Sequence, residues 1–392
     1  MKGLRQLAIP ESLIRPALII RIVVLTMLIQ FGISLPAWIP GFRDIPEISL
    51  IPFPGSGTLP AGITLTAFCA MILSCIAILF RPGRRNPILI LLVSAAILVL
   101  ADINRLQPWL YAYILILLPF VFMDKPDPQI LYRNVIAILA FTYFWSGLHK
   151  INPFFPKEMF IVIADGFGLG ALARENPEAG FVAAGLEMGS GILLIFRITR
   201  NCGLILAIAM HLTILMALGP VGISWNAVVW PWNICYILLG IIAATGLGRA
   251  GSSSGKAPVE WVVIFLVGAM PIANFFGFWP HFLSGSFYSS LLPNSAMMFP
   301  AEKIKELPPS AMPFLQESRQ PGNYILRMDQ WVLEDLHLPL FSEEMIHRKL
   351  GQSICKGFRE DDGIQIVVSR RNRFHNETRY QIFFPNFRRA TR

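Results

Sequence analysis

The chain has 392 residues, of which 54% are hydrophobic and only 15% are charged. Ordinary soluble domains carry charges on about 25% of their residues, so this composition excludes a soluble globular protein and predicts a polytopic membrane protein. The net charge of +9 comes without a basic stretch interleaved with aromatic residues, so we do not expect nucleic acid as a partner. In a membrane protein such an excess normally orients the spans and attracts anionic lipid.

Apolar segments of suitable length for membrane helices follow one another along most of the chain. We expect nine spans, over residues 16–39, 61–80, 87–101, 110–123, 132–148, 178–196, 201–218, 224–246 and 259–278. The segment from Asn152 to Pro177 is less hydrophobic, which predicts a short interfacial helix and loop.

Basic residues gather in alternate loops between these spans. Because such residues are enriched on the cytoplasmic side, they predict a cytoplasmic N-terminus and an extracytoplasmic C-terminal tail. The residues concerned are Lys2, Arg5, Arg15, the turn 81–85, Lys125, Arg133, Arg197, Arg200, Arg249 and Lys256.

The composition changes after residue 278, which suggests a membrane domain over residues 1–278 and a separate tail over residues 279–392. In the tail, Leu336 to Leu350 is typical of an amphipathic helix punctuated by proline, and Gly363 to Ser369 and Arg379 to Phe384 alternate like strands. The expected fold is therefore an all-α membrane bundle of about nine helices with a small α+β C-terminal appendage.

Lys150 ends the fifth predicted span. Tyr143, Ser146 and Gly147 precede it at helical spacings of seven, four and three, so it lies on a small, polar face. A lysine at a span end is commonly an anchor whose stem reaches the interface. A lysine held among apolar groups can instead lose its charge and act as a base or nucleophile. His149 lies about 100° around the helix, where it either binds a headgroup or is structural.

Glu187 and His211 each lie near the middle of an apolar span. A carboxylate at that depth costs about 3 kcal/mol on insertion scales, so it requires a partner or a polar cavity. The two residues fall at similar heights on consecutive antiparallel spans, so we expect them to pair, although each could also be an ordinary packing residue. The Gly185 and Gly189 pair is expected to let another helix approach closely.

Two aromatic turns are predicted on the same side as Lys150. One contains Gln107, Trp109 and Tyr111, and the other begins at Trp225. They are either part of an interfacial aromatic belt or the walls of a site for a flat ligand. The five cysteines form no CxxC pair, and the sequence contains no P-loop, dinucleotide fingerprint, GxSxG or HExxH motif, so no metal is expected.

The stretch Phe144 to Asn152 resembles the aromatic-small-Gly-x-x-Lys-(Leu/Ile)-(Asp/Asn) motif of the HTTM membrane domain. That domain belongs to the vitamin K-dependent gamma-carboxylase superfamily. Leu106 to Tyr113 resembles a second turn of the domain, Asn-His-(Ser/Tyr)-Tyr-Leu-Tyr, with Gln107 where the carboxylases have histidine. Glu187 to Leu194, followed by His211, is similar to the core shared with DoxX-like membrane proteins. The resemblance covers about residues 4–291.

The resemblance implies that Lys150 is a base that deprotonates a reduced, vitamin K-like quinone near the outer face. It further implies a pocket walled by Trp145, His149, Gln107, Trp109, Tyr111 and Trp225. Activity would then be that of a carboxylase-like, quinol-dependent lyase or oxidoreductase. The alternative is a DoxX-like subunit, non-catalytic or electron-transferring, whose tail docks an extracytoplasmic protein. The sequence leaves open whether the chain is an enzyme.

Overall fold

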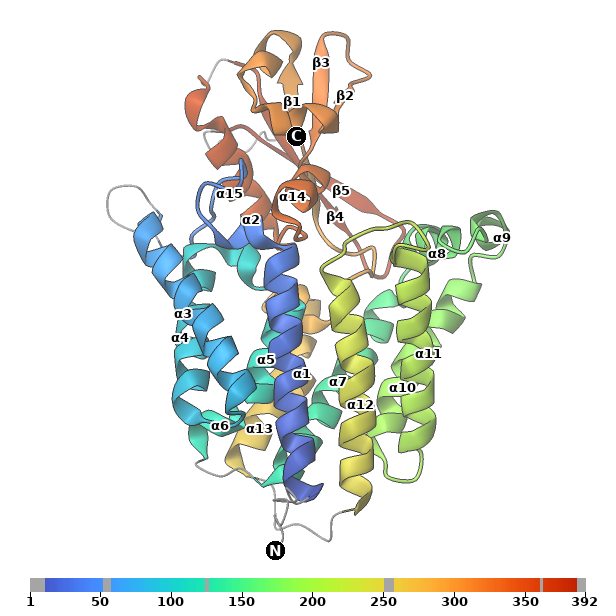
Figure 1. Cartoon of the computed structure of the whole chain (residues 1–392). Helices are drawn as coiled ribbons and strands as arrows, with labels where there is room; N and C mark the ends of the chain where they lie inside the picture. The colour runs from blue at the N-terminus through green and yellow to red at the C-terminus, as the bar shows by residue number, and fades with distance from the viewer. Residues whose placement is uncertain (1–10, 52–57, 124–126, 250–256, 360–361, 386–392) are drawn as a thin grey trace, which may run out of the picture.

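The computed structural model describes residues 11–51, 58–123, 127–249, 257–359 and 362–385. Lys2, Arg5, Lys125 and Lys256, which contribute to the predicted orientation, lie outside these ranges. A bundle of helices carries a smaller mixed domain on the end opposite the N-terminus (Figure 1). The helices of the bundle are α1 (Glu11–Ile33), α2 (Leu35–Trp38), α3 (Ala61–Phe80), α4 (Arg85–Ala101), α5 (Pro108–Leu117), α6 (Pro119–Phe122), α7 (Pro128–Lys150), α8 (Met159–Asp165), α9 (Gly170–Glu175), α10 (Ala179–Ile195), α11 (Arg200–Leu218), α12 (Val229–Arg249) and α13 (Pro258–Ile264).

Five of the described helical segments are long and apolar enough to cross a membrane: Pro16–Ile33, Ala61–Phe80, Arg200–Leu218, Val229–Leu247 and Pro258–Phe276. Three shorter apolar segments, Arg85–Ala101, Pro108–Phe122 and Ala179–Ile195, pack with them. The chain is therefore a multi-pass membrane protein. Each predicted span coincides with helical structure, although nine membrane crossings stay a prediction.

The predicted spans 110–123 and 259–278 are interrupted, and proline explains both of these interruptions. Pro119 separates α5 from the short helix α6, because a proline cannot continue the backbone hydrogen-bond ladder. After α13 the last span continues as a π-helical turn, Phe265–Ala269, and a 3₁₀ segment, Met270–Phe276, with Pro271 near the start of the latter. A π turn leaves carbonyl groups without their usual helical partner, and two of these accept side-chain hydrogen bonds near the candidate site.

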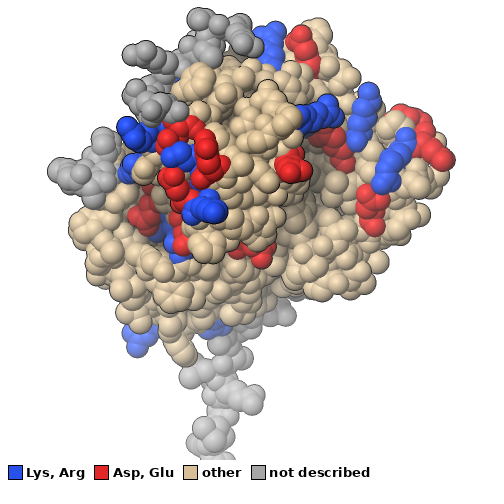
Figure 2. Space-filling model, turned by 90° about the horizontal axis from the view of Figure 1, so that it is seen from above, with Lys and Arg blue, Asp and Glu red and all other residues tan. Residues whose placement is uncertain are grey.

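The C-terminal domain is built on a five-stranded antiparallel sheet with the order β2-β3-β1-β4-β5. Its strands are β1 (Asn294–Pro300), β2 (Leu315–Glu317), β3 (Asn323–Arg327), β4 (Gln365–Arg371) and β5 (Thr378–Phe383). Alternate residues of β1 and β4 are buried, and these face the helices α14 (Met328–Leu336) and α15 (Glu344–Ile354). Viewed from this end, the charged side chains gather on the domain and on the rim of the bundle (Figure 2).

The two strands predicted in the tail are confirmed as β4 and β5, whereas the predicted helix from Leu336 to Leu350 is wrong over its first half. The helix α14 ends at Leu336, His337 adopts a left-handed conformation with φ of 52°, and Pro339 follows. A left-handed residue and a proline terminate a helix, so the chain stays irregular until α15 begins at Glu344.

Candidate functional site

Three hydrogen bonds, one from the last turn of α7 and two from α10, hold the side chain of Lys150 in place. Its ammonium group donates to Ser146 Oγ at 2.6 Å and to the two carboxylate oxygens of Glu187 at 2.9 and 2.7 Å. The side chains of Lys150 and Glu187 are only 7% and 11% exposed. Lys150 therefore does not extend to solvent as an interfacial anchor would, and Ser146 contacts it as the helical spacing indicated.

Close packing of α7 against α10 brings Glu187 to Lys150. A methyl group on Gly147 would collide with the backbone of Met188 and Ala184, and one on Gly191 would collide with the backbone of α7. The predicted role of Gly185 and Gly189 is wrong, because a Cβ at either position meets nothing within 4 Å. Small residues do permit the contact, as in other membrane helices, but they are Gly147 and Gly191.

The end of α7 is fixed by Asn152. Its side-chain oxygen accepts hydrogen bonds from the backbone N–H groups of Phe154 and Phe155, and its amide donates to the carbonyl groups of His149 and Ser289. Asn152 thus ties the last helical turn to a loop that precedes β1. These contacts explain why α7 ends within the sequence His-Lys-Ile-Asn-Pro, where Pro153 follows Asn152 and cannot continue the helix.

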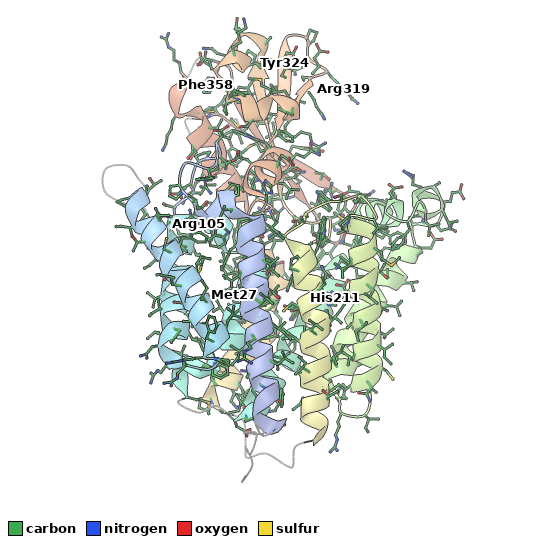
Figure 3. The ribbon with its side chains drawn as sticks, viewed as in Figure 1. Met27, Arg105, His211, Arg319, Tyr324 and Phe358 are labelled. Atoms are coloured by element: carbon green, nitrogen blue, oxygen red, sulfur yellow. The ribbon has the colours of Figure 1, made fainter. Side chains whose placement is uncertain are left out.

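A second group of hydrogen-bonded polar side chains, Tyr143, His211 and Asn233, links three helices inside the bundle. The hydroxyl group of Tyr143 lies 2.7 Å from His211 Nε2, and His211 Nδ1 lies 2.7 Å from Asn233 Oδ1. The amide nitrogen of Asn233 donates to Val229 O, so its oxygen is the acceptor. A neutral His211 then carries its proton on Nδ1, and Tyr143 donates to Nε2. His211 lies about midway along the bundle (Figure 3).

The expected Glu187–His211 pair is not formed. Glu187 is bonded to Lys150, whereas both ring nitrogens of His211 are bonded to Tyr143 and Asn233. Glu187 and His211 do lie at similar depths in the bundle, as their positions along the two helices indicated, because both residues line one cavity. The direct partner of each residue depends instead on how the helices are rotated about their axes.

The two polar groups face a common cavity of about 40 Å³, which we call the lysine cavity. Its volume accommodates a few water molecules and is well below the roughly 300 Å³ or more of a typical ligand pocket. Its lining combines the polar groups with aromatic and aliphatic side chains: Thr142, Tyr143, Lys150, Glu187, Met210, His211, Ile214, Val229, Trp232, Asn233, Tyr236, Phe287 and Tyr288.

A second cavity of about 30 Å³ shares a wall with the lysine cavity. Two predicted ligand-binding residues, Tyr111 and Trp145, line it. Their side chains donate to carbonyl groups of the π turn, Tyr111 to Leu266 O at 3.4 Å and Trp145 to Gly268 O at 3.2 Å. The wall common to both cavities consists of Thr142, Trp232, Tyr236 and Phe287.

Two irregular loops cover the lysine cavity at the end nearest the C-terminal domain. Four of their residues have a positive φ although none is glycine: Ser224 at 47°, Asn226 at 54°, Tyr288 at 58° and Ser290 at 60°. The loops meet where Asn226 donates to the Tyr288 hydroxyl and where Trp225 packs edge-on against the Tyr288 ring. Left-handed conformations of such residues are strained and concentrate at functional sites. We call these two loops the roof.

Four predicted ligand-binding residues line neither cavity. Gln107 donates to Asn104 O and to Pro339 O of the C-terminal domain, so it joins the two domains. Trp109 is fully buried against the aromatic rings of Phe31, Trp38 and Tyr113. Trp225 packs behind Tyr288 in the roof, and His149 is buried beneath the C-terminal domain.

The hairpin between β4 and β5 is attached to the end of α7. Arg373 donates to His149 Nδ1 at 2.5 Å and lies 3.9 Å from the centre of the Phe275 ring. Arg371 donates to Ser290 O in the roof and pairs with Glu158. Sequence reasoning gave no indication of these contacts, because they join residues more than 80 positions apart. The C-terminal domain therefore holds both the end of α7 and the roof.

Among the described residues, no three His, Cys, Asp or Glu side chains gather as a metal site requires. No protein-family model matches the chain, and comparisons with curated proteins and with solved structures also found no match. The functional argument therefore rests on the residues of this chain and on their geometry.

Proposed function

We propose that this multi-pass membrane protein binds a quinol-type ligand at the lysine cavity and uses Lys150, together with Glu187, to accept its proton. The observation that carries the proposal is the buried Lys150–Glu187–Ser146 cluster, which opens onto a cavity walled by aromatic rings. The resemblance of Phe144 to Asn152 to the gamma-carboxylase superfamily supports the same ligand class. The tail would lie on the extracytoplasmic side, as the basic loops predict.

Glu187 can take a proton from Lys150, and this would allow the hydrogen-bonded lysine to act as a base. The Lys150–Glu187 pair has two protonation states, ammonium with carboxylate and amine with carboxylic acid, and both have the same net charge. In surroundings of low dielectric constant the ion pair loses most of its hydration. The difference in free energy between the ion pair and the neutral amine–acid pair is therefore smaller than in water. Once its proton has moved to Glu187 Oε2, 2.7 Å away, the neutral Lys150 amine can accept a proton from a ligand hydroxyl group.

The lining suits a quinol chemically, because a cation and hydrogen-bonding groups face aromatic side chains. The volume of about 40 Å³ does not admit an aromatic head group in this closed form. Access then requires movement of the roof or of the shared wall, where Phe287 contributes to both cavities. The strained backbone of Tyr288 and Ser290 makes the roof the part that we expect to move.

Native mass spectrometry of the purified protein, incubated anaerobically with a short-chain naphthoquinol, tests this proposal. The wild-type chain should retain one naphthoquinol, and the double variant Lys150→Met/Glu187→Met should retain none. The double variant removes both charges together, so it should fold. Equal retention by the two proteins would exclude the lysine cavity as the binding site.

A second function, that of a non-catalytic subunit, is favoured by one observation. The three hydrogen bonds of Lys150 use all three ammonium protons on Ser146 and Glu187, as a purely structural cluster would. Under this alternative the double methionine variant complements a deletion of the gene as well as the wild-type chain does. Truncation after Leu291, which removes the C-terminal domain together with its contacts to the roof and to α7, abolishes complementation.

A further inference from the structure

The turn between α3 and α4 forms a groove at the end of the bundle opposite the C-terminal domain. The groove has a volume of about 520 Å³, and its lining includes Phe80, Arg81, Arg84, Arg85, Asn86 and Pro87. Three of these side chains are arginine, and none of the residues that line the groove is acidic. We call it the arginine groove. It is separate from the lysine cavity, which lies in the interior of the bundle.

Two of its cations are not neutralised by the protein. In the part of the chain that the structure describes, the guanidinium groups of Arg81 and Arg84 take part in no hydrogen bond or ion pair, and both residues are exposed. Two unpaired guanidinium groups on one groove favour an anion with several oxygen atoms, because guanidinium binds phosphate through paired N–H groups.

The surroundings of the groove are those of a lipid. Phe80 is 79% exposed at its edge, and both helices that lead away from it present apolar side chains outward. On α3 these are Leu73 and Ile76, and on α4 they are Leu89, Ile90 and Val93. The helices α3 and α4 lie side by side at one edge of the bundle (Figure 1), where acyl chains can cover them.

We propose that the arginine groove binds the phosphate headgroup of one anionic phospholipid, whose acyl chains lie along α3 and α4. Arg81 and Arg84 contact the phosphate, and Phe80 packs against the glycerol and the first methylene groups. The site lies in the leaflet on the N-terminal side of the protein. Anionic lipid is favoured over zwitterionic lipid because no acidic side chain in the groove compensates the arginines.

Native mass spectrometry of the delipidated full chain, titrated separately with phosphatidylglycerol and phosphatidylcholine, tests the site. We expect the first phosphatidylglycerol to bind the wild-type protein about 30-fold more tightly than phosphatidylcholine, a preference of the size that two arginines near a membrane surface provide. The double variant Arg81→Gln/Arg84→Gln should lose this preference. Both positions are exposed, so the variant should fold normally.

The control is Arg197→Gln/Arg200→Gln, which removes the same charge at the same end of the bundle, where Arg197 follows α10 and Arg200 begins α11 and donates to Leu194 O. It should keep the preference for phosphatidylglycerol. If the control loses the preference as fully as the groove variant does, the attraction is a diffuse effect of charge and the proposal is wrong. The proposal is also wrong if the groove variant keeps the preference, or if excess inorganic phosphate displaces the lipid and thereby identifies a free-anion site.

Discussion

Lys150 differs from a snorkelling lysine in what its ammonium group contacts. An anchor presents its charge to water and headgroups, whereas Lys150 is bonded to a carboxylate inside the bundle. On the same helix, Tyr143 belongs to a second hydrogen-bonded group with His211 and Asn233. Both groups line one cavity. The site thus has two hydrogen-bonded groups that can each hold or release a proton, and this is the residue-level basis of the proposed function.

The energetics of the Lys150–Glu187 pair can be tested by removing one charge or both. Lys150→Met alone leaves the Glu187 carboxylate buried without its partner, which should cost about 3–5 kcal/mol of stability. Lys150→Met/Glu187→Met removes both charges and should cost much less than the single variant. Thermal unfolding in detergent measures the two costs. A single variant as stable as the double variant would show that the two side chains do not depend on each other.

Part of the site could be predicted from single residues and helical spacing, and part could not. The spacing placed Ser146 and Tyr143 on the face of Lys150, and the cost of a buried carboxylate required a partner for Glu187. The partner itself was mispredicted, because sequence gives the height of a residue along a helix but not the rotation of that helix. Gln107 was expected in the pocket but bonds Pro339, a residue more than 200 positions away.

At the scale of elements, the contact between α7 and α10 positions the site. The extents of most helices follow from apolar segments bounded by Pro, Gly and basic residues, and the structure confirms those helices. The depth of helix–helix contact depends on which glycines face the neighbouring helix. Gly147 and Gly191 do so, whereas Gly185 and Gly189 do not. A single sequence does not distinguish these two pairs, since all four glycines lie in helices at similar spacings.

The glycine pairs supply a matched test of this contact. Gly147→Ala should separate α7 from α10, lower the melting temperature and weaken naphthoquinol binding, because the new methyl group meets backbone atoms. Gly185→Ala should be neutral or stabilising by up to about 1 kcal/mol, since alanine favours a helix and has room there. Thermal unfolding and ligand binding are measured for both variants. Equal effects of the two substitutions would contradict the described packing.

At the scale of the whole molecule, the C-terminal domain closes one end of the bundle. Gln107 and Asn104 form hydrogen bonds with its backbone. Arg373 contacts His149 in α7, and Arg371 contacts Ser290 in the roof. Its own core contains His347, whose burial beside His281 lowers the pKa of His347 to about 4. The pKa of a histidine in an unfolded chain is about 6.5, so the unfolded chain binds a proton more readily than the folded domain does.

The domain should therefore lose stability as the pH falls from about 6.5 towards 4, and this loss should stop below the folded pKa. The full effect is on the order of 3 kcal/mol, and the stability is fully present above pH 6.5. Hydrogen exchange of peptides from β1 and α15, corrected for the intrinsic exchange rate, measures it in the intact protein. His347→Gln should remove this part of the pH dependence. An unchanged dependence in that variant would contradict the assignment of this effect to His347.

The central claim is that the lysine cavity accepts a proton from an acidic hydroxyl group. Its most direct test is an anaerobic binding titration of the wild-type protein with a short-chain naphthoquinol and with the dimethyl ether of the same compound. The ether retains the ring but carries a methyl group on each oxygen, so it has no hydroxyl proton to give. The account predicts that the quinol binds at least about tenfold more tightly, and that Lys150→Met/Glu187→Met abolishes the difference. Equal affinity of the wild-type protein for both compounds would contradict it.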